Sequence, residues 1–181
     1  GLTEDEAATL HGSFVLDTLE RTKAAVHKFK LPVDRFLACA PSSTHVFFRI
    51  MEARHGVTLL DQPGDNLGDR MAQAFSTLFA RGYRHGFLVG TDVPSLPLTH
   101  YRDAVQSLTR HDLILGPAKD GGYYLIGMTA PHPDLFSDIP WSTDQVMGLT
   151  QQKAAAAGLK TALLPVWSDV DTLDDLQALI D

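Results

Sequence analysis

Three short segments of this chain carry carboxylates and glycines at spacings that could do chemistry. The first is GTDVPSLP, in which Asp92 follows an apolar run that ends at Gly90. Glycine lets a ligand approach the backbone closely, and Pro94 and Pro97 stiffen the chain that follows. A carboxylate fixed at the end of a strand suits a hard cation such as Mg²⁺, which takes one or two carboxylates together with ligand phosphates. An Asx-turn before proline would explain the same aspartate without a ligand.

The second segment is KDGGYY, in which Asp120 precedes Gly121 and Gly122. Paired glycines permit unusual backbone angles and expose amide N–H groups, a good surface for a phosphate or a sugar hydroxyl. The following tyrosines, Tyr123 and Tyr124, could stack on a ring or donate hydrogen bonds. Asp-Gly and Gly-Gly are also the commonest pairs in β-hairpin turns, and the pattern taken alone favours that interpretation.

The third segment is WSDVDTLDDL, in which Asp169 and Asp171 lie just before a predicted helix. Asp171 or Thr172 is a natural N-cap, and acidic residues in a first helical turn suit the helix dipole. Capping needs only one of the two aspartates, so the other is a candidate second metal ligand. Without further context, capping is the better explanation.

The composition limits the classes of function that remain. The chain has 181 residues and a net charge of −7, and no stretch concentrates lysine and arginine, which argues against a nucleic-acid partner. No apolar run is long enough to span a bilayer, and no signal-peptide pattern opens the chain. Cys39 is the only cysteine, so no intrachain disulfide can form. We expect a cytoplasmic protein.

Strand and helix patterns alternate along the chain, and several strand patterns are continuously apolar. Strands of that kind are buried on both faces, which indicates a mainly parallel sheet covered by helices. The sequence therefore predicts one three-layer α/β/α domain over residues 1–181. In an open α/β sheet ligands bind beyond the carboxyl ends of the strands, where all three segments fall. The predicted strands are 35–41, 57–60, 86–90, 112–118, 123–128 and 161–165.

In this order, the three segments resemble a family of bacterial nucleotide-diphospho-sugar transferase-like proteins, some of which are linked to arsenosugar biosynthesis. The stretches DNLGDRM at 65–71 and IPWSTDQV at 139–146 also resemble that family, and the likeness extends over nearly the whole chain. The resemblance implies a GT-A type fold, and a metal-dependent glycosyltransferase that takes a nucleotide sugar and a small acceptor. It also implies roles for particular residues.

By that resemblance, Asp92 holds Mg²⁺ or Mn²⁺ against the nucleotide diphosphate. Asp171 matches the aspartate that can complete the metal site in related nucleotidyltransferases, and Asp169 is its competitor for that role. Asp120 is a candidate catalytic base, although an aspartate in a hairpin would look the same. The neighbouring residues that would face the sugar or the acceptor are Gly121, Gly122 and Tyr123. The residues that would border the nucleotide are Gln62, Gly64, Leu67, Gly68, Gly90 and Thr91.

The sequence departs from the family at its start. Family members begin with a strand and a loop of the type K-x-P-x-x-G-x-x-K-T-R-L, and nothing like it precedes LTEDEAATL. With Gly1 where an initiator methionine is expected, we expect a fragment, or a chain that lacks an N-terminal piece. Such a chain would lack a central strand and bind nucleotides poorly. An exposed sheet edge would also suit a homodimer.

Two other functions fit the same residues. A nucleotidyltransferase would join a nucleoside triphosphate to a phosphorylated small molecule and release pyrophosphate, with the same metal and fold. A degenerate binding or assembly module would keep the fold without the chemistry. The products separate the first two, and a metal response that depends on Asp92 separates both from the third.

Overall fold

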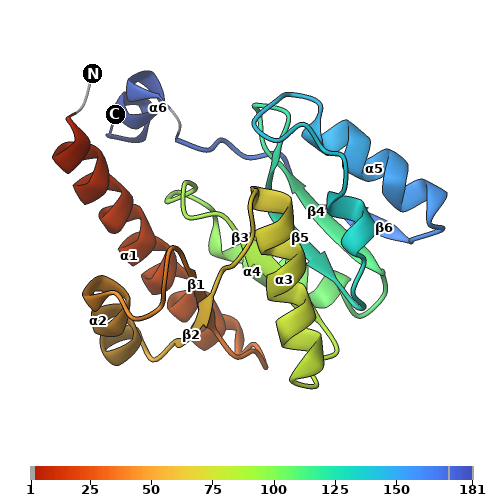
Figure 1. Cartoon of the computed structure of the whole chain (residues 1–181), viewed down its shortest axis with the longest axis horizontal. Coiled ribbons are helices and arrows are strands. Elements are labelled where there is room, and N and C mark those ends of the chain that lie inside the picture. The colour runs from red at the N-terminus through yellow and green to blue at the C-terminus, as the bar shows by residue number, and fades with distance from the viewer. Residues whose placement is uncertain (1–2, 171, 181) are drawn as a thin grey trace.

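The computed structural model describes residues 3–170 and 172–180 (Figure 1). Among these residues, no helix combines the length and the apolar character that crossing a bilayer requires. The helices are α1 (Glu4–Phe29), α2 (Val46–His55), α3 (Leu67–Ala80), α4 (Leu98–Ser107), the 3₁₀ helix η1 (Pro133–Phe136), α5 (Val146–Ala156) and α6 (Leu173–Ile180). The strands are β1 (Phe36–Cys39), β2 (Thr58–Asp61), β3 (Gly86–Val89), β4 (Leu113–Pro117), β5 (Tyr123–Met128) and β6 (Thr161–Leu163).

A capping box begins α1. The Thr3 hydroxyl accepts a hydrogen bond from the Glu6 amide, and the Glu6 carboxylate accepts one from the Thr3 amide at 2.8 Å. This reciprocal capping box satisfies two amides that a helix otherwise leaves without partners. At its other end, α1 stops on Lys30 in the left-handed conformation, with φ 52°.

The strands form two sheets. β1 and β2 make a parallel pair, and the other four strands are ordered β3-β5-β4-β6. β5 runs antiparallel to both of its neighbours, whereas β4 and β6 are parallel. The predicted α/β class is therefore confirmed, but the larger sheet is mixed, because β5 is reversed and makes two of its three pairings antiparallel.

Helices cover both faces of the four-stranded sheet. Ile114 packs with Ala25 of α1 and Ala104 of α4 on one face. The flanking residues of the same strand, Leu113 and Leu115, pack with α3, η1 and α5 on the other face. The side chains of Leu113, Ile114 and Leu115 are completely buried, which is why this part of β4 has a continuously apolar sequence.

α1 contacts both sheets. Val15 and Leu19 pack on β1 together with Met51 of α2, and Ala25 packs in the core of the larger sheet. In Figure 1 the β1–β2 pair lies beside β3, with α1 and α2 on the outer side. Within the described residues, β1 and β3 each pair along one edge only. The small sheet is therefore attached to the large one through α1 and side-chain contacts.

Candidate functional site

The three segments singled out by the sequence lie together beyond the carboxyl ends of β3 and β4. The Gly90 amide donates to the Tyr124 carbonyl at 2.9 Å, which ties the first segment to β5. The Lys119 amide donates to the Trp167 carbonyl at 3.1 Å, and the Trp167 amide donates to the Pro117 carbonyl at 3.0 Å. These bonds join the second segment to the third.

The loop that carries Asp92 is held firmly. Val93 and Leu96, which lie on either side of Pro94, are buried in the core beneath the loop. A Cβ atom placed on Gly90 would lie 2.5 Å from Asp92 Oδ1, so the carboxylate occupies the space that a side chain at position 90 would fill. A side chain at position 90 would therefore displace the Asp92 carboxylate from this place.

The third segment meets the first directly. The Val170 amide donates to the Asp92 carbonyl at 2.9 Å, which places Asp169 next to the Asp92 loop. Asp171 lies outside the described residues. The cap of α6 is supplied by Thr172, whose hydroxyl accepts from the Asp175 amide at 3.1 Å while the Asp175 carboxylate accepts from the Thr172 amide at 2.9 Å. Capping therefore does not require Asp169.

The described residues contain no group of three or more histidine, cysteine, aspartate or glutamate side chains that could enclose a metal. Asp92 and Asp169 lie on two adjoining loops, which the hydrogen bond from the Val170 amide to the Asp92 carbonyl joins. Mg²⁺ is commonly bound by one or two carboxylates, with water and ligand phosphates in the remaining positions. A closed all-protein cage is not what this chemistry requires.

The second segment forms the turn of the β4–β5 hairpin, the interpretation that its sequence pattern alone favours. Asp120 is exposed, and its Oδ1 atom accepts from the Gly122 amide at 2.9 Å. Gly121 has φ 92°, and an added Cβ would lie 2.5 Å from Asp144 Cα. The Gly121 carbonyl also accepts from the Met147 amide at 2.9 Å. The turn is thus pressed against the segment that leads into α5.

The structure turns the phenol of Tyr123 inward. The ring packs against the core that α3, η1 and α5 share, beside the buried Thr150. Burial raises the pKa of this phenol far above its ordinary value. Among the residues predicted to face a sugar or acceptor, only Asp120, Gly121 and Gly122 lie at the exposed turn.

The loop after β2 leads into α3 beside the same turn. The Gln62 amide donates to the Cys39 carbonyl at 2.9 Å, and the Gly64 carbonyl accepts from Arg70 Nε at 3.2 Å. A Cβ on Gly68 would lie 2.6 Å from the Trp141 ring and 2.9 Å from the Phe136 carbonyl, so this glycine permits close packing of α3 on these two residues. Leu67 remains 49% exposed.

The residues that join these loops could not be identified from the sequence. The Trp167 indole Nε1–H donates to Ser95 Oγ at 3.0 Å, and Arg21 Nε of α1 donates to the Leu96 carbonyl at 2.9 Å. Neither pair is signalled by local spacing, because the partners are 72 and 75 residues apart. Asp144, whose backbone supports Gly121, lies in the IPWSTDQV stretch that carries part of the family resemblance.

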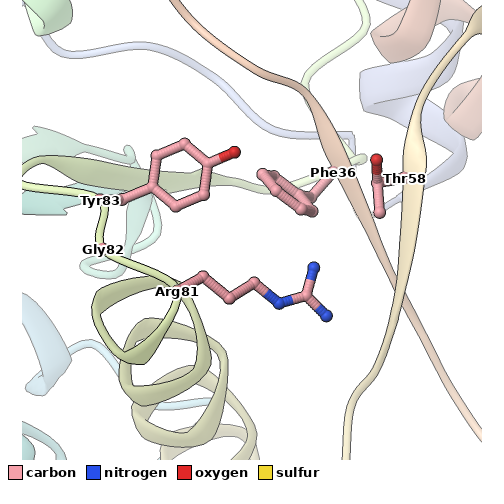
Figure 2. A pocket seen from close by; sticks show the side chains of 5 residues that line it. All are labelled: Phe36, Thr58, Arg81, Gly82 and Tyr83. Carbon is pink, nitrogen blue, oxygen red and sulfur yellow. The ribbon is translucent and has the colours of Figure 1, made fainter.

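A cavity of about 310 Å³ lies at the opposite edge of the sheets, at the amino ends of β1 and β2 (Figure 2). Phe36 and Thr58 line it from the strands, and the residues after α3 line it from the other side. Figure 2 shows the Phe36 and Tyr83 rings facing one another above the Arg81 guanidinium. None of the predicted site residues lines this cavity, so the candidate site is the carboxyl edge.

The fold is that of the nucleotide-diphospho-sugar transferase-like proteins. A protein of Desulfovibrio desulfuricans G20, described as a "putative nucleotide-diphospho-sugar transferase", matches with a TM-score of 0.84 and 34% identity. That match covers 97% of this chain and 74% of the other. 4-Diphosphocytidyl-2C-methyl-D-erythritol synthase matches with a TM-score of 0.60 and 11% identity, over 89% of this chain and 86% of the other. That likeness shows the fold alone.

CMP:2-keto-3-deoxy-manno-octonic acid synthetase in complex with CTP has the same fold. It matches with a TM-score of 0.57 and 12% identity, over 92% of this chain and 87% of the other. No curated protein matches the chain. Residues 24–143 match the family model described as uncharacterized protein conserved in bacteria (DUF2064), and the chain belongs to that family.

Proposed function

We propose that the protein is a divalent-metal-dependent transferase that moves a sugar from a nucleotide-diphospho-sugar to a small acceptor. The observation that carries the proposal is the hydrogen bond between Val170 and Asp92, which draws two aspartate-bearing loops together beside the Asp120 turn. The name of the relative at 34% identity supports the same class of reaction. The three loops come from separate parts of the chain, and core packing alone does not require aspartates on them.

The carboxylates of Asp92 and Asp169 would hold Mg²⁺ or Mn²⁺, with Asp171 as a further candidate ligand. When bound, the cation supplies positive charge to the diphosphate as the bond to the sugar breaks. The backbone at Gly90 and Thr91 would lie along the nucleotide, next to the Asp92 carboxylate.

The other residues of the edge would bind the two ends of the substrates. Leu67 would pack against the base, and Gln62 and Gly64 would lie near the ribose. Asp120 would accept the proton of the attacking acceptor hydroxyl while the sugar forms its new bond and the nucleoside diphosphate leaves. One oxygen of this carboxylate is held in place by the hydrogen bond from the Gly122 amide.

A thermal-shift screen tests the proposal. The protein is heated with UDP-, GDP-, ADP- and dTDP-sugars and with the corresponding nucleoside triphosphates, each with and without Mn²⁺. A ligand present at 100 times its dissociation constant adds about 2.7 kcal/mol to the free energy of unfolding. We expect a Mn²⁺-dependent rise in melting temperature with one nucleotide sugar, lost in Asp92→Asn and kept in Asp17→Asn, an exposed aspartate on α1.

Product analysis then separates the two enzymatic alternatives. Release of a nucleoside diphosphate from the sugar nucleotide supports the glycosyltransferase. Release of pyrophosphate from a triphosphate would instead establish a nucleotidyltransferase. A rise in melting temperature that survives in Asp92→Asn would contradict the assigned metal site, and the absence of any metal response would favour a binding module.

A further inference from the structure

The loops that carry Asp92 and Asp169 lie against each other with a defined register. The Val170 amide contacts the Asp92 carbonyl at 2.9 Å, and the Trp167 indole contacts Ser95 Oγ at 3.0 Å. Two residues separate the contacts on each side, and the two segments run in opposite directions. Segments 92–95 and 167–170 therefore form a short antiparallel pair with a backbone bond at one end and a side-chain bond at the other.

The donor of the side-chain bond is fixed in position. The Trp167 backbone bonds twice to the end of β4 and the residues just after it, through the Pro117 carbonyl and the Lys119 amide. Its ring meets His100 edge-on, with ring centroids 5.5 Å apart, and His100 is 6% exposed. Because the backbone and one ring edge are both held, the indole N–H has little freedom to turn away from its acceptor.

The acceptor is fixed as well. Leu96, the residue after Ser95, has a fully buried side chain, and its carbonyl accepts hydrogen bonds from the Arg21 side chain of α1. The Leu96 amide donates to the Val93 carbonyl at 3.0 Å, which closes a tight turn. The hydroxyl of Ser95 is thereby presented to the third segment by a rigid loop.

Two carboxylates that share a cation repel each other until the cation arrives. A neutral hydrogen bond between rigid groups can hold their loops together in the absence of the ion without adding charge. We propose that Trp167 and Ser95 are a positioning pair: their hydrogen bond sets the register of segments 92–95 and 167–170, so that Asp92 and Asp169 reach one divalent cation. This inference rests on the proposed function for its ligand, and on geometry alone for the register.

Two measurements on the full chain test the pair. The first is the dissociation constant of Mn²⁺ alone, measured by electron paramagnetic resonance. The second is the hydrogen-exchange protection of the Val170 amide, measured by NMR without metal. The variants are Trp167→Phe, Ser95→Ala and the double variant. The controls are Trp141→Phe, which removes the other indole N–H, and Ser76→Ala, an exposed hydroxyl on α3.

We expect each single variant to lower Val170 protection and to weaken Mn²⁺ binding by about three- to tenfold, the effect of losing one neutral hydrogen bond. The double variant should show no further loss, because both substitutions remove the same bond. The two controls should match the parent protein in both measurements.

The outcomes separate this inference from the function on which it rests. Unchanged Val170 protection in both single variants would overturn the inference whatever the metal does. Lowered protection with unchanged Mn²⁺ affinity would also overturn it, since the register would then not position the ligands. If the variants lower Val170 protection but the parent protein binds no Mn²⁺, the result would support the register and overturn the proposed metal site.

Discussion

The phenol of Tyr83 donates a 2.6 Å hydrogen bond to the carboxylate of Asp34. Asp34 lies just before β1 and Tyr83 lies just before β3, so this bond joins the two sheets at their amino ends. The Tyr83 ring also meets Phe36 edge-on, with centroids 5.5 Å apart. The acceptor carboxylate raises the pKa of the phenol, because ionised tyrosine could not donate to it. The contact lies beside the cavity of Figure 2.

We predict that Tyr83→Phe loosens the small sheet without unfolding the large one. Cys39 reports on this opening, because its side chain is 0% exposed and burial raises the pKa of its thiol to about 11. A thiol reagent should label it slowly in the native protein and about two- to fivefold faster in the variant. Asp34→Ala removes the same bond and should speed labelling equally. Equal labelling rates in parent and variants would contradict the role assigned to this contact.

Gly121→Ala should destabilise the protein severely. Its φ of 92° is strained for alanine, and the new methyl group would collide with the Asp144 backbone. We expect a loss of about 2–4 kcal/mol in urea denaturation, since neither backbone can yield easily. Gly148→Ala is the matched control. Position 148 lies within α5, and nothing lies near the place of its Cβ atom. Alanine there should therefore add about 0.5–1 kcal/mol to the free energy of unfolding. Comparable losses from both substitutions would be inconsistent with the turn geometry.

The stability of the protein should fall as the pH is lowered below about 6.5, the ordinary pKa of histidine. Burial lowers the pKa of His100 in the folded protein, and nearby Asp103 opposes this only in part. Between the lowered pKa and 6.5 the unfolded chain binds a proton that folded His100 does not, so stability declines there by at most about 1.4 kcal/mol per pH unit. Above 6.5 this contribution is fully present.

Urea denaturation of the parent and of His100→Leu from pH 7.5 to pH 5.5 measures this effect. The variant should show a shallower decline, because leucine takes up no proton. Parallel stability curves for the two proteins would show that His100 does not cause the pH dependence.

Local chemistry predicted much of the fold. The six apolar runs all form strands, although only β4 and β5 are buried along nearly their whole length. The capping box of Thr3 and Glu6 can be recognised in the sequence because both partners lie within four residues. α5 begins at Val146, after residues that pack against Gly121 and Gly68.

The site was predicted less completely. Asp92, Asp120 and Asp169 could be picked out because each ends or follows a strand pattern, and the structure does gather their loops. The burial of the Tyr123 side chain could not be predicted. Strand alternation does not tell which face of the sheet the helices cover, and Tyr123 is buried because it lies on a covered face. The Trp167–Ser95 bond joins residues 72 apart, and only the tertiary fold brings them together.

The facing edges of β1 and β3 bear on how the protein behaves in concentrated solution. Within the described residues each edge has a strand on one side only, so its remaining amides and carbonyls can pair with another chain. Such edges recruit extended segments by backbone bonding, with little regard for sequence. The apparent molecular mass in sedimentation should therefore rise with protein concentration, and a short apolar peptide that forms strands should suppress that rise.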